Sequence, residues 1–111
     1  MKITRSDDVV KNPVDMAGAK DVGIRVLISK ADGAQNFAMR MFEVQPGGHT
    51  PLHTHSNEHE VFILEGRGLL VYKGGEYRFE SGHVIFVEPD SEHQFKNTGN
   101  TVLKFLCLIP A

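Results

Sequence analysis

The sequence predicts an all-β protein, an antiparallel sandwich or barrel of about eight or nine short strands. Turn signals recur about every 8 to 12 residues. The segments between them are rich in β-branched and aromatic residues, as strands are. No segment has the period of about 3.6 residues that marks an amphipathic helix. An all-β class therefore accounts for nearly the whole chain.

The first part of the chain is expected to be an irregular arm followed by two strands. Residues 1–22 have mixed polarity and an Asn-Pro break, which disfavours a helix. Residues 24–29 form the first predicted strand, and residues 37–44 form a second that ends at Pro46-Gly47-Gly48. Such an arm is expected to pack on a partner subunit.

The remaining strands are expected to follow in quick succession. Gly74-Gly75 is a strong hairpin signal between two of them. The predicted strands lie at 61–64, 69–73, 77–80, 83–87, 93–97 and 102–109.

Composition limits the chain to a few classes. A chain of 111 residues with 41% apolar residues supports one core, so we expect a single domain over 1–111, with an arm at 1–22 and a β-barrel at 23–111. A net charge of −2 with scattered basic residues disfavours nucleic-acid binding. No apolar run reaches the about 18 to 20 residues that span a membrane, and the polar start is unlike a signal peptide, so we expect a cytoplasmic protein.

The histidines gather in one segment and at one distant position. In an extended strand, residues two apart point to the same side, so His53 and His55 would aim at one point, with His59 following after a polar corner and His93 arriving from another strand. Imidazole is the commonest protein ligand for transition metals. The single Cys107 excludes a site built on several thiolates. On spacing alone, a solvated pair explains the His-x-His sequence equally well.

This segment resembles the first motif of the cupin superfamily. That motif runs Gly, five residues, His-x-His, three or four residues, Glu, six residues, Gly, and Gly47, His53, His55, His59 and Gly66 keep its spacing. The departure is His59, which stands where the family usually has glutamate. Glu60 fits the longer gap and is the alternative ligand, but Gly66 would then come one residue early.

A second segment resembles the second cupin motif, which runs Gly, five residues, Pro-x-Gly, two residues, His, three residues, Asn. Gly82, His93 and Asn97 keep the full spacing. Pro89 is one residue late and Asp90 replaces the second glycine, so this turn departs from the family pattern.

The resemblance implies a double-stranded β-helix, or jelly roll, known as the cupin barrel. It also implies one divalent metal on His53, His55, His59 and His93, as in a subgroup of small cupins. Manganese or iron is favoured by the resemblance, whereas the affinity order of nitrogen-rich sites leaves zinc, nickel and copper open. Four neutral imidazoles leave the metal its full charge, which would attract anionic or enolisable oxygen ligands.

Other residues are expected to border the metal. Phe95 shares the strand face of His93, and Phe105 and Cys107 lie on the more apolar face of the last strand. Arg40 interrupts an apolar strand and would pair with a substrate carboxylate. For each of these four residues, a purely structural role is the alternative. For Phe95, Phe105 and Cys107 this alternative role is core packing. For Arg40 the alternative is a position on an exposed strand face.

The expected function is that of a small-molecule enzyme. The resemblance suggests dioxygenation, oxidative cleavage, or isomerisation through an enolate. A non-catalytic module that binds a metal or small ligand is the alternative. Small cupins also suggest a homodimer, joined through the arm and the sheet edges.

Overall fold

A computed structural model describes all 111 residues and contains nine strands and two short 3₁₀ turns. The turns are η1 (Ser6–Asp8) and η2 (Lys30–Asp32), and each has three residues, so no helix is long enough to cross a membrane. The strands are β1 (Asn12–Pro13), β2 (Lys20–Ile28), β3 (Phe37–His49), β4 (His59–Glu65), β5 (Arg67–Tyr72), β6 (Gly75–Glu80), β7 (Val84–Val87), β8 (His93–Asn97) and β9 (Leu103–Pro110).

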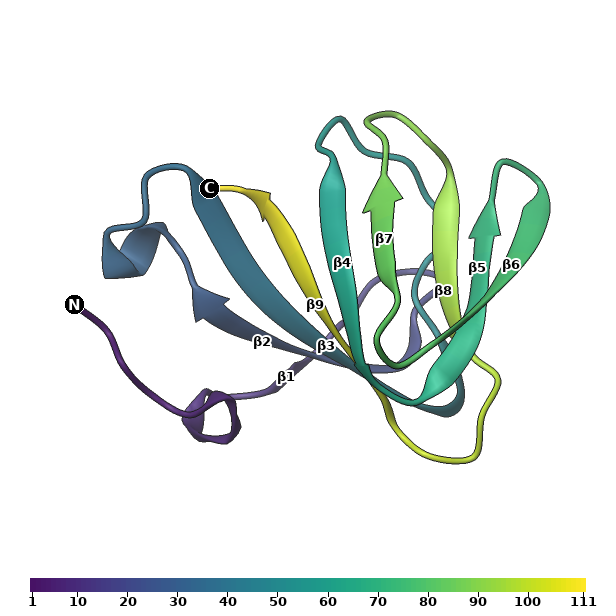
Figure 1. The fold of residues 1–111 in the computed structure, drawn as a ribbon, viewed down its shortest axis with the longest axis horizontal. Coiled ribbons are helices and arrows are strands. Elements are labelled where there is room, and N and C mark those ends of the chain that lie inside the picture. Colours follow the sequence, from purple (N-terminus) through teal and green to yellow (C-terminus); the bar gives the residue numbers. More distant parts are fainter.

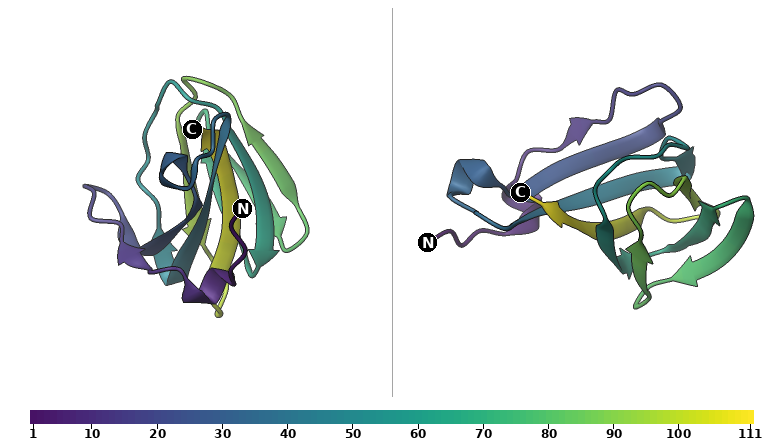
Figure 2. Two further views of the ribbon diagram at one scale, coloured as in Figure 1. Left: turned by 90° about the vertical axis from the view of Figure 1, so that its left-hand side faces the viewer. Right: turned by 90° about the horizontal axis from the view of Figure 1, so that it is seen from above.

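The strands form one curled sheet that folds into two facing layers. One layer runs β1-β2-β3-β9-β4-β7, and the other runs β8-β5-β6. The far end of β3 joins the layers, because His49 pairs with Lys96 of β8. Figure 1 shows β2, β3 and β9 reaching away from the upright strands β4 to β8, and the view from above in Figure 2 shows the same extension. The jelly roll predicted from the sequence is confirmed.

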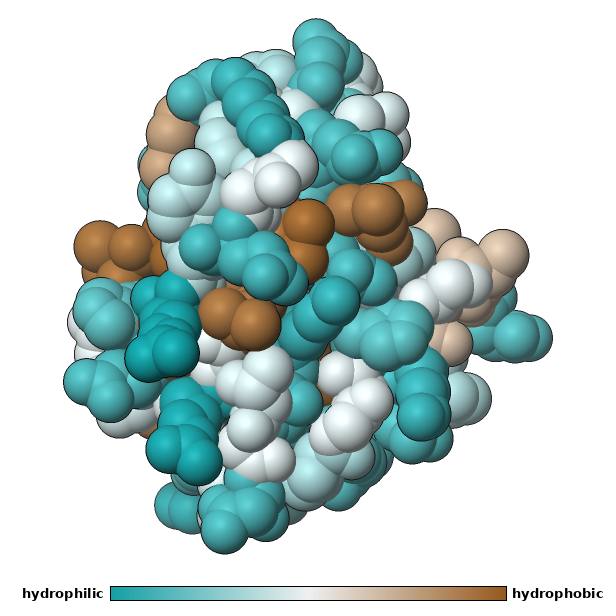
Figure 3. All heavy atoms as spheres, turned by 90° about the vertical axis from the view of Figure 1, so that its right-hand side faces the viewer, coloured by the Kyte–Doolittle hydropathy of each residue, from teal (hydrophilic) through white to brown (hydrophobic).

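The core lies between the two layers. Its largest fully buried side chains come from β3, β4, β7 and β9: Phe105, Ile63, Leu103, Val44, Val87 and Cys107. Burying such side chains is the main favourable contribution to folding, at roughly 1.5 to 3 kcal/mol each. The face beyond β5 and β6 is mostly hydrophilic, with apolar residues in separate small groups (Figure 3). The alternation of polarity read from the sequence therefore separates an inner face from a solvent face.

Two glycine-containing segments show how local sequence and strand pairing set strand length. Lys73 and Gly74 have φ values of 49° and 79°, and Tyr72 pairs with Gly75, which makes the two-residue hairpin that favours glycine. β3 was expected to end at Pro46-Gly47-Gly48, but it continues to His49. Gly47 has φ 81°, and the register of β2 against β3 shifts between Lys20 and Val22, so a bulge carries the strand through.

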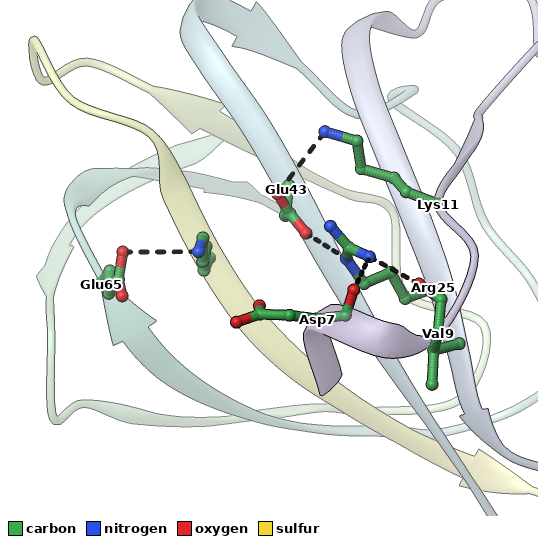
Figure 4. Close-up of polar contacts among 7 residues, drawn as sticks. Asp7, Val9, Lys11, Arg25, Glu43 and Glu65 are labelled. Carbon is green, nitrogen blue, oxygen red and sulfur yellow. Dashed lines mark hydrogen bonds and ion pairs between the residues drawn. The ribbon is translucent and has the colours of Figure 1, made fainter. Parts of the chain in front are cut away.

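The N-terminal arm is tied to its own sheet. The Arg25 guanidinium donates to the carbonyls of Val9, at 2.5 Å, and Asp7, at 3.4 Å, and its Nε donates to the Glu43 carboxylate at 2.7 Å (Figure 4). Lys11 lies 3.7 Å from the same carboxylate. Burial raises the pKa of Glu43, but the hydrogen bond from Arg25 and the charges of Arg25 and Lys11 outweigh it, so the pKa lies below its usual value of 4.5. The arm thus has anchors within the chain, although packing on a partner was expected.

Candidate metal centre

The four candidate histidines come from two segments that meet inside the barrel. His59 begins β4 and His93 begins β8, whereas His53 and His55 lie in the connection between β3 and β4. His53 and His93 form an isolated antiparallel bridge, in which each backbone N–H donates to the other's carbonyl, at 3.3 and 3.1 Å. This bridge places their side chains next to each other.

Three of the imidazoles form a group with the dimensions of a metal site. One ligand atom from each of His53, His55 and His93 lies within 4.8 Å of the others. Their ring centroids are 5.0, 5.2 and 4.8 Å apart. Nitrogens at about 2.1 Å from one ion are separated by roughly 3 to 4 Å. Small rotations of the rings would therefore bring the three nitrogens onto one ion.

The hydrogen bonds of these rings fix which nitrogen is free. The Nδ1 atoms of His53 and His93 lie 2.9 Å from the carbonyls of Pro51 and Ser91, and His55 Nδ1 lies 3.0 Å from the Asn57 carbonyl, each in the histidine's own segment. Because a carbonyl only accepts, each Nδ1 carries the proton and each Nε2 keeps its lone pair.

The free nitrogens fit a metal. His55 Nε2 is buried and has no hydrogen-bond partner. An orphaned buried acceptor is unfavourable unless something binds it. Three neutral imidazoles oriented by backbone carbonyls are a donor set suited to a divalent transition metal.

His59 lies beside this group and is not one of its three members. Its Nε2 is 3.1 Å from His55 Nδ1, and its Nδ1 is 2.8 Å from Cys107 Sγ. Since His55 Nδ1 donates to Asn57, His59 Nε2 is the bare nitrogen and the His59 proton points to the sulfur. The His59 ring centroid is 4.0 Å from that of His55 and 5.5 Å from that of His93. His59 Nε2 therefore faces the Nδ1 side of His55, and its ring would have to turn to join the group of His53, His55 and His93.

Burial favours the neutral form of three imidazoles, those of His55, His59 and His93. It lowers the pKa of His59 to about 3, with the neighbouring His55 and Arg40 acting in the same direction. Burial also lowers the pKa of His55 and of His93. The neutral imidazole is the form that binds a metal.

The cluster opens into a cavity of about 350 Å³. All four histidines line it, and so do the four residues expected at the pocket. Its walls are Val14, Asp15, Met16, Val22, Ile24, Arg40, Phe42, Thr50, Pro51, His53, His55, His59, His93, Phe95, Phe105 and Cys107. That Arg40, Phe95, Phe105 or Cys107 contacts a substrate stays a prediction.

Arg40 brings a positive charge to this cavity without a matching carboxylate. Its Nη2 donates to Cys107 Sγ at 3.1 Å and lies 3.3 Å from His59 Nδ1. Its Nε is buried without a partner, and its guanidinium carbon lies 5.1 Å from the centre of the Phe42 ring. Arg40 forms no ion pair with a carboxylate of the chain. Burial raises the pKa of Cys107, so its thiol is neutral.

The polar residues near the motif separate into those inside and those outside the site. Glu60, the alternative ligand, points to the outer face of β4, in a groove with Phe62 and Phe86, so the structure removes it as a ligand. The Nδ1 atoms of His53, His55 and His93 all contact backbone carbonyls. His49 and His83 lie outside the cavity, and His83 Nδ1 accepts from the Glu80 N–H.

Several wall residues carry no signal in the sequence. Val14, Asp15 and Met16 belong to the arm, and Val22 and Ile24 to β2. No motif spacing marks them. Only the antiparallel register of β2 against β3, which sets Ile24 opposite Phe42, brings this wall to the site.

Comparison with known proteins gives consistent matches. Residues 40–109 match the family model for the cupin domain. An oxalate-binding protein of Thermotoga maritima is 33% identical over 96% of this chain and 92% of its own. The 1-methylthio-D-xylulose 5-phosphate methylsulfurylase of Rhodospirillum rubrum is 36% identical over 66% of this chain, and the match spans 47% of that protein.

A solved structure is similar over almost the entire chain. The polyketide cyclase RemF from Streptomyces resistomycificus superposes with a TM-score of 0.93 and 37% sequence identity. The superposition covers 99% of this chain and 79% of that one.

Proposed function

The chain belongs to the cupin domain family, and we propose that it is a metal-dependent enzyme that binds a small oxygenated, anionic substrate. The observation that carries the proposal is the convergence of bare imidazole nitrogens in a cavity that also holds the unpaired guanidinium of Arg40. Such a site combines metal ligands with a receptor for negative charge.

The proposed ligands of the metal are His53, His55, His59 and His93. His53, His55 and His93 form the three-nitrogen group, and His59, whose ring centroid is 4.0 Å from that of His55, would join them by a turn of its ring. Manganese or iron is the proposed ion, with zinc, nickel and copper as alternatives. When bound, the ion would act as a Lewis acid that polarises a carbonyl and stabilises negative charge on its oxygen.

The residues of the chain supply orientation and a dry environment. The free Arg40 Nε would donate to a carboxylate or enolate oxygen of the substrate. The Cys107 sulfur accepts from Nη2 at the other end of the guanidinium and so fixes its direction. Phe95 and Phe105, both almost fully buried, exclude water from one side. Exclusion of water strengthens each of these electrostatic contacts.

Among the reaction classes expected from the sequence, we favour proton transfer through an enolate over reaction with dioxygen. The support is the similarity to a polyketide cyclase over 99% of the chain. The alternative is a non-catalytic binding module, and the similarity to an oxalate-binding protein supports it. Deuterium uptake at the carbon next to a bound carbonyl, without oxygen consumption, would distinguish proton transfer from reaction with dioxygen and from binding without catalysis.

Metal content tests the site directly. Untagged protein should hold about one equivalent of divalent metal by elemental analysis. His53→Ala and His59→Ala should each lower metal affinity by tenfold or more, whereas His49→Ala, outside the cavity, should leave it unchanged. Unchanged metal content in His53→Ala would refute the metal site. Unchanged content in His59→Ala alone would reduce the ligand set to three histidines.

We also propose a homodimer. Phe62, Val84 and Phe86 are 43%, 74% and 55% exposed on the outer face of β4 and β7, and β7 is a sheet edge. Exposed apolar side chains beside an open edge favour association. Light scattering should give twice the 12.3 kDa of one chain, and a monomer mass at micromolar concentration would contradict the proposal.

A further inference from the structure

Resting on the metal site proposed above, we infer that the ligand of this cavity is amphipathic. It carries an anionic, chelating oxygen head, such as a 2-oxo acid, and an apolar body, preferably aromatic. The inference comes from how polar and apolar side chains are layered along the strands that line the cavity.

The layer nearest the metal cluster is polar. Arg40 on β3 pairs with Cys107 on β9, and both face the cavity. His93 on β8 contributes to the same end, where it stands next to His53. The buried unpartnered Nε of Arg40 and Nε2 of His55 both belong to this end. An anionic head placed here would meet a metal and a guanidinium together.

Two residues further along each strand, the layer is apolar. Phe42 follows Arg40, and it pairs with Phe105 on β9 and with Ile24 on β2. Phe95 follows His93 on β8 in the same way. Residues two apart on a strand share a face and lie about 6.5 to 7 Å apart. A benzyl or longer apolar group attached to the head spans that distance.

The apolar layer is a preformed aromatic surface. Phe42 and Phe105 are stacked with ring centroids 5.3 Å apart, and Phe95 and Phe105 are stacked at 4.7 Å. Ile24 and Val22 also line the cavity, as does Met16, which is more than half exposed. An aromatic body would add a further ring to this stack.

The cavity is larger than a ligand that consists of the anionic head alone would need. About 350 Å³ is the volume of roughly a dozen water molecules. A two-carbon dicarboxylate would fill the polar layer only and leave the apolar walls in contact with water. The inferred ligand therefore differs from the one named for the Thermotoga maritima relative, despite 33% sequence identity.

A matched pair of 2-oxo acids tests the inference. Phenylpyruvate and pyruvate have the same head, and only the first has an aromatic body. Titration of the full chain loaded with Mn²⁺ should give a Kd for phenylpyruvate at least tenfold below those for pyruvate and oxalate, because ring burial removes apolar surface from water. The metal-free chain should bind all three more weakly.

Variants locate the preference in the apolar layer. Phe42→Ala should weaken phenylpyruvate binding fivefold or more, and by more than it weakens pyruvate binding, which depends on this ring only through the Arg40 guanidinium beside it. Phe37→Ala, on the same strand but 70% exposed, is the matched control and should change neither. If Phe42→Ala does not fold, Ile24→Thr is the substitute, because it removes one carbon from the side chain and places a hydroxyl in the same layer.

The outcomes separate the inference from the proposed function. Equal Kd values for phenylpyruvate and pyruvate on the Mn²⁺ form, or tighter binding of oxalate, would overturn the amphipathic ligand and leave the metal site standing. If the Mn²⁺ form binds none of the three acids more tightly than the metal-free form does, both proposals fall.

Discussion

Substitution of Asn97 by alanine should destabilise the protein strongly without touching the cavity. Asn97 ends β8 and is 3% exposed. Its Nδ2 donates to the carbonyls of Val44 and Thr101 at 2.8 and 2.9 Å, and its Oδ1 accepts from the Gly99 N–H at 2.9 Å. The side chain thus joins β8 to β3 and closes the turn that leads into β9. Alanine removes all three bonds.

Each of these bonds contributes about 0.5 to 1.5 kcal/mol, so their loss should lower the free energy of unfolding by roughly 2 to 4 kcal/mol. Urea unfolding followed by circular dichroism should show a lower midpoint with an unchanged slope. The control is Asn100→Ala, three residues on and exposed, which should stay within about 0.5 kcal/mol of the wild type. A loss below about 1 kcal/mol for Asn97→Ala would refute this account.

Two further predictions concern titratable groups. The pKa of Glu43 is lowered on folding, so its stabilisation is present above about pH 4.5 and lost as the pH falls through the folded pKa. Glu43→Gln should flatten the fall in urea stability between about pH 5 and 3, and an unchanged slope would contradict the pairing with Arg25. Cys107 is 2% exposed and burial raises its pKa, so iodoacetamide should react at least 100-fold more slowly with folded than with urea-unfolded protein. Comparable rates would show that the thiol is open to solvent.

The sequence was sufficient for the all-β class because its signals are local, whereas the jelly roll was implied by the resemblance to cupins. Alternating polarity and turn residues mark each strand where it lies, as in β8, whose predicted bounds of 93–97 are those observed. β3 was missed in part because Pro46-Gly47-Gly48 is normally a terminator. Pairing of Lys20 with His49 continues the strand beyond it, and a long-range pairing of this kind has no local signature.

In the candidate site too, residues marked by local spacing were predicted, and residues placed by long-range pairing were not. The i, i+2 rule predicted that His53 and His55 share a direction, and both belong to the three-nitrogen group. The far wall of the cavity, including Val14 and Ile24, depends on how the arm and β2 lie against β3, which spacing in the sequence does not encode. The same holds for the contact of Arg25 with the arm, which no local pattern in the sequence marks.

The register between the loop of the first motif and β8 decides whether a metal site exists at all. His49 pairs with Lys96, the Thr50 N–H donates to the Phe95 carbonyl, and His53 pairs with His93. In a sheet, a slip of one residue turns each side chain to the opposite face. Such a slip would separate His53 from His93.

The side chain of Thr50 fixes this register. Thr50 is buried, and its Oγ1 accepts from the Phe95 N–H at 2.9 Å, a bond that a one-residue slip would break. Thr50 lies between the glycine and the first histidine of the motif, at a position for which the motif demands no particular residue. Its hydroxyl, three residues before His53, adds a side-chain bond to the backbone pairing that brings His53 and His93 together.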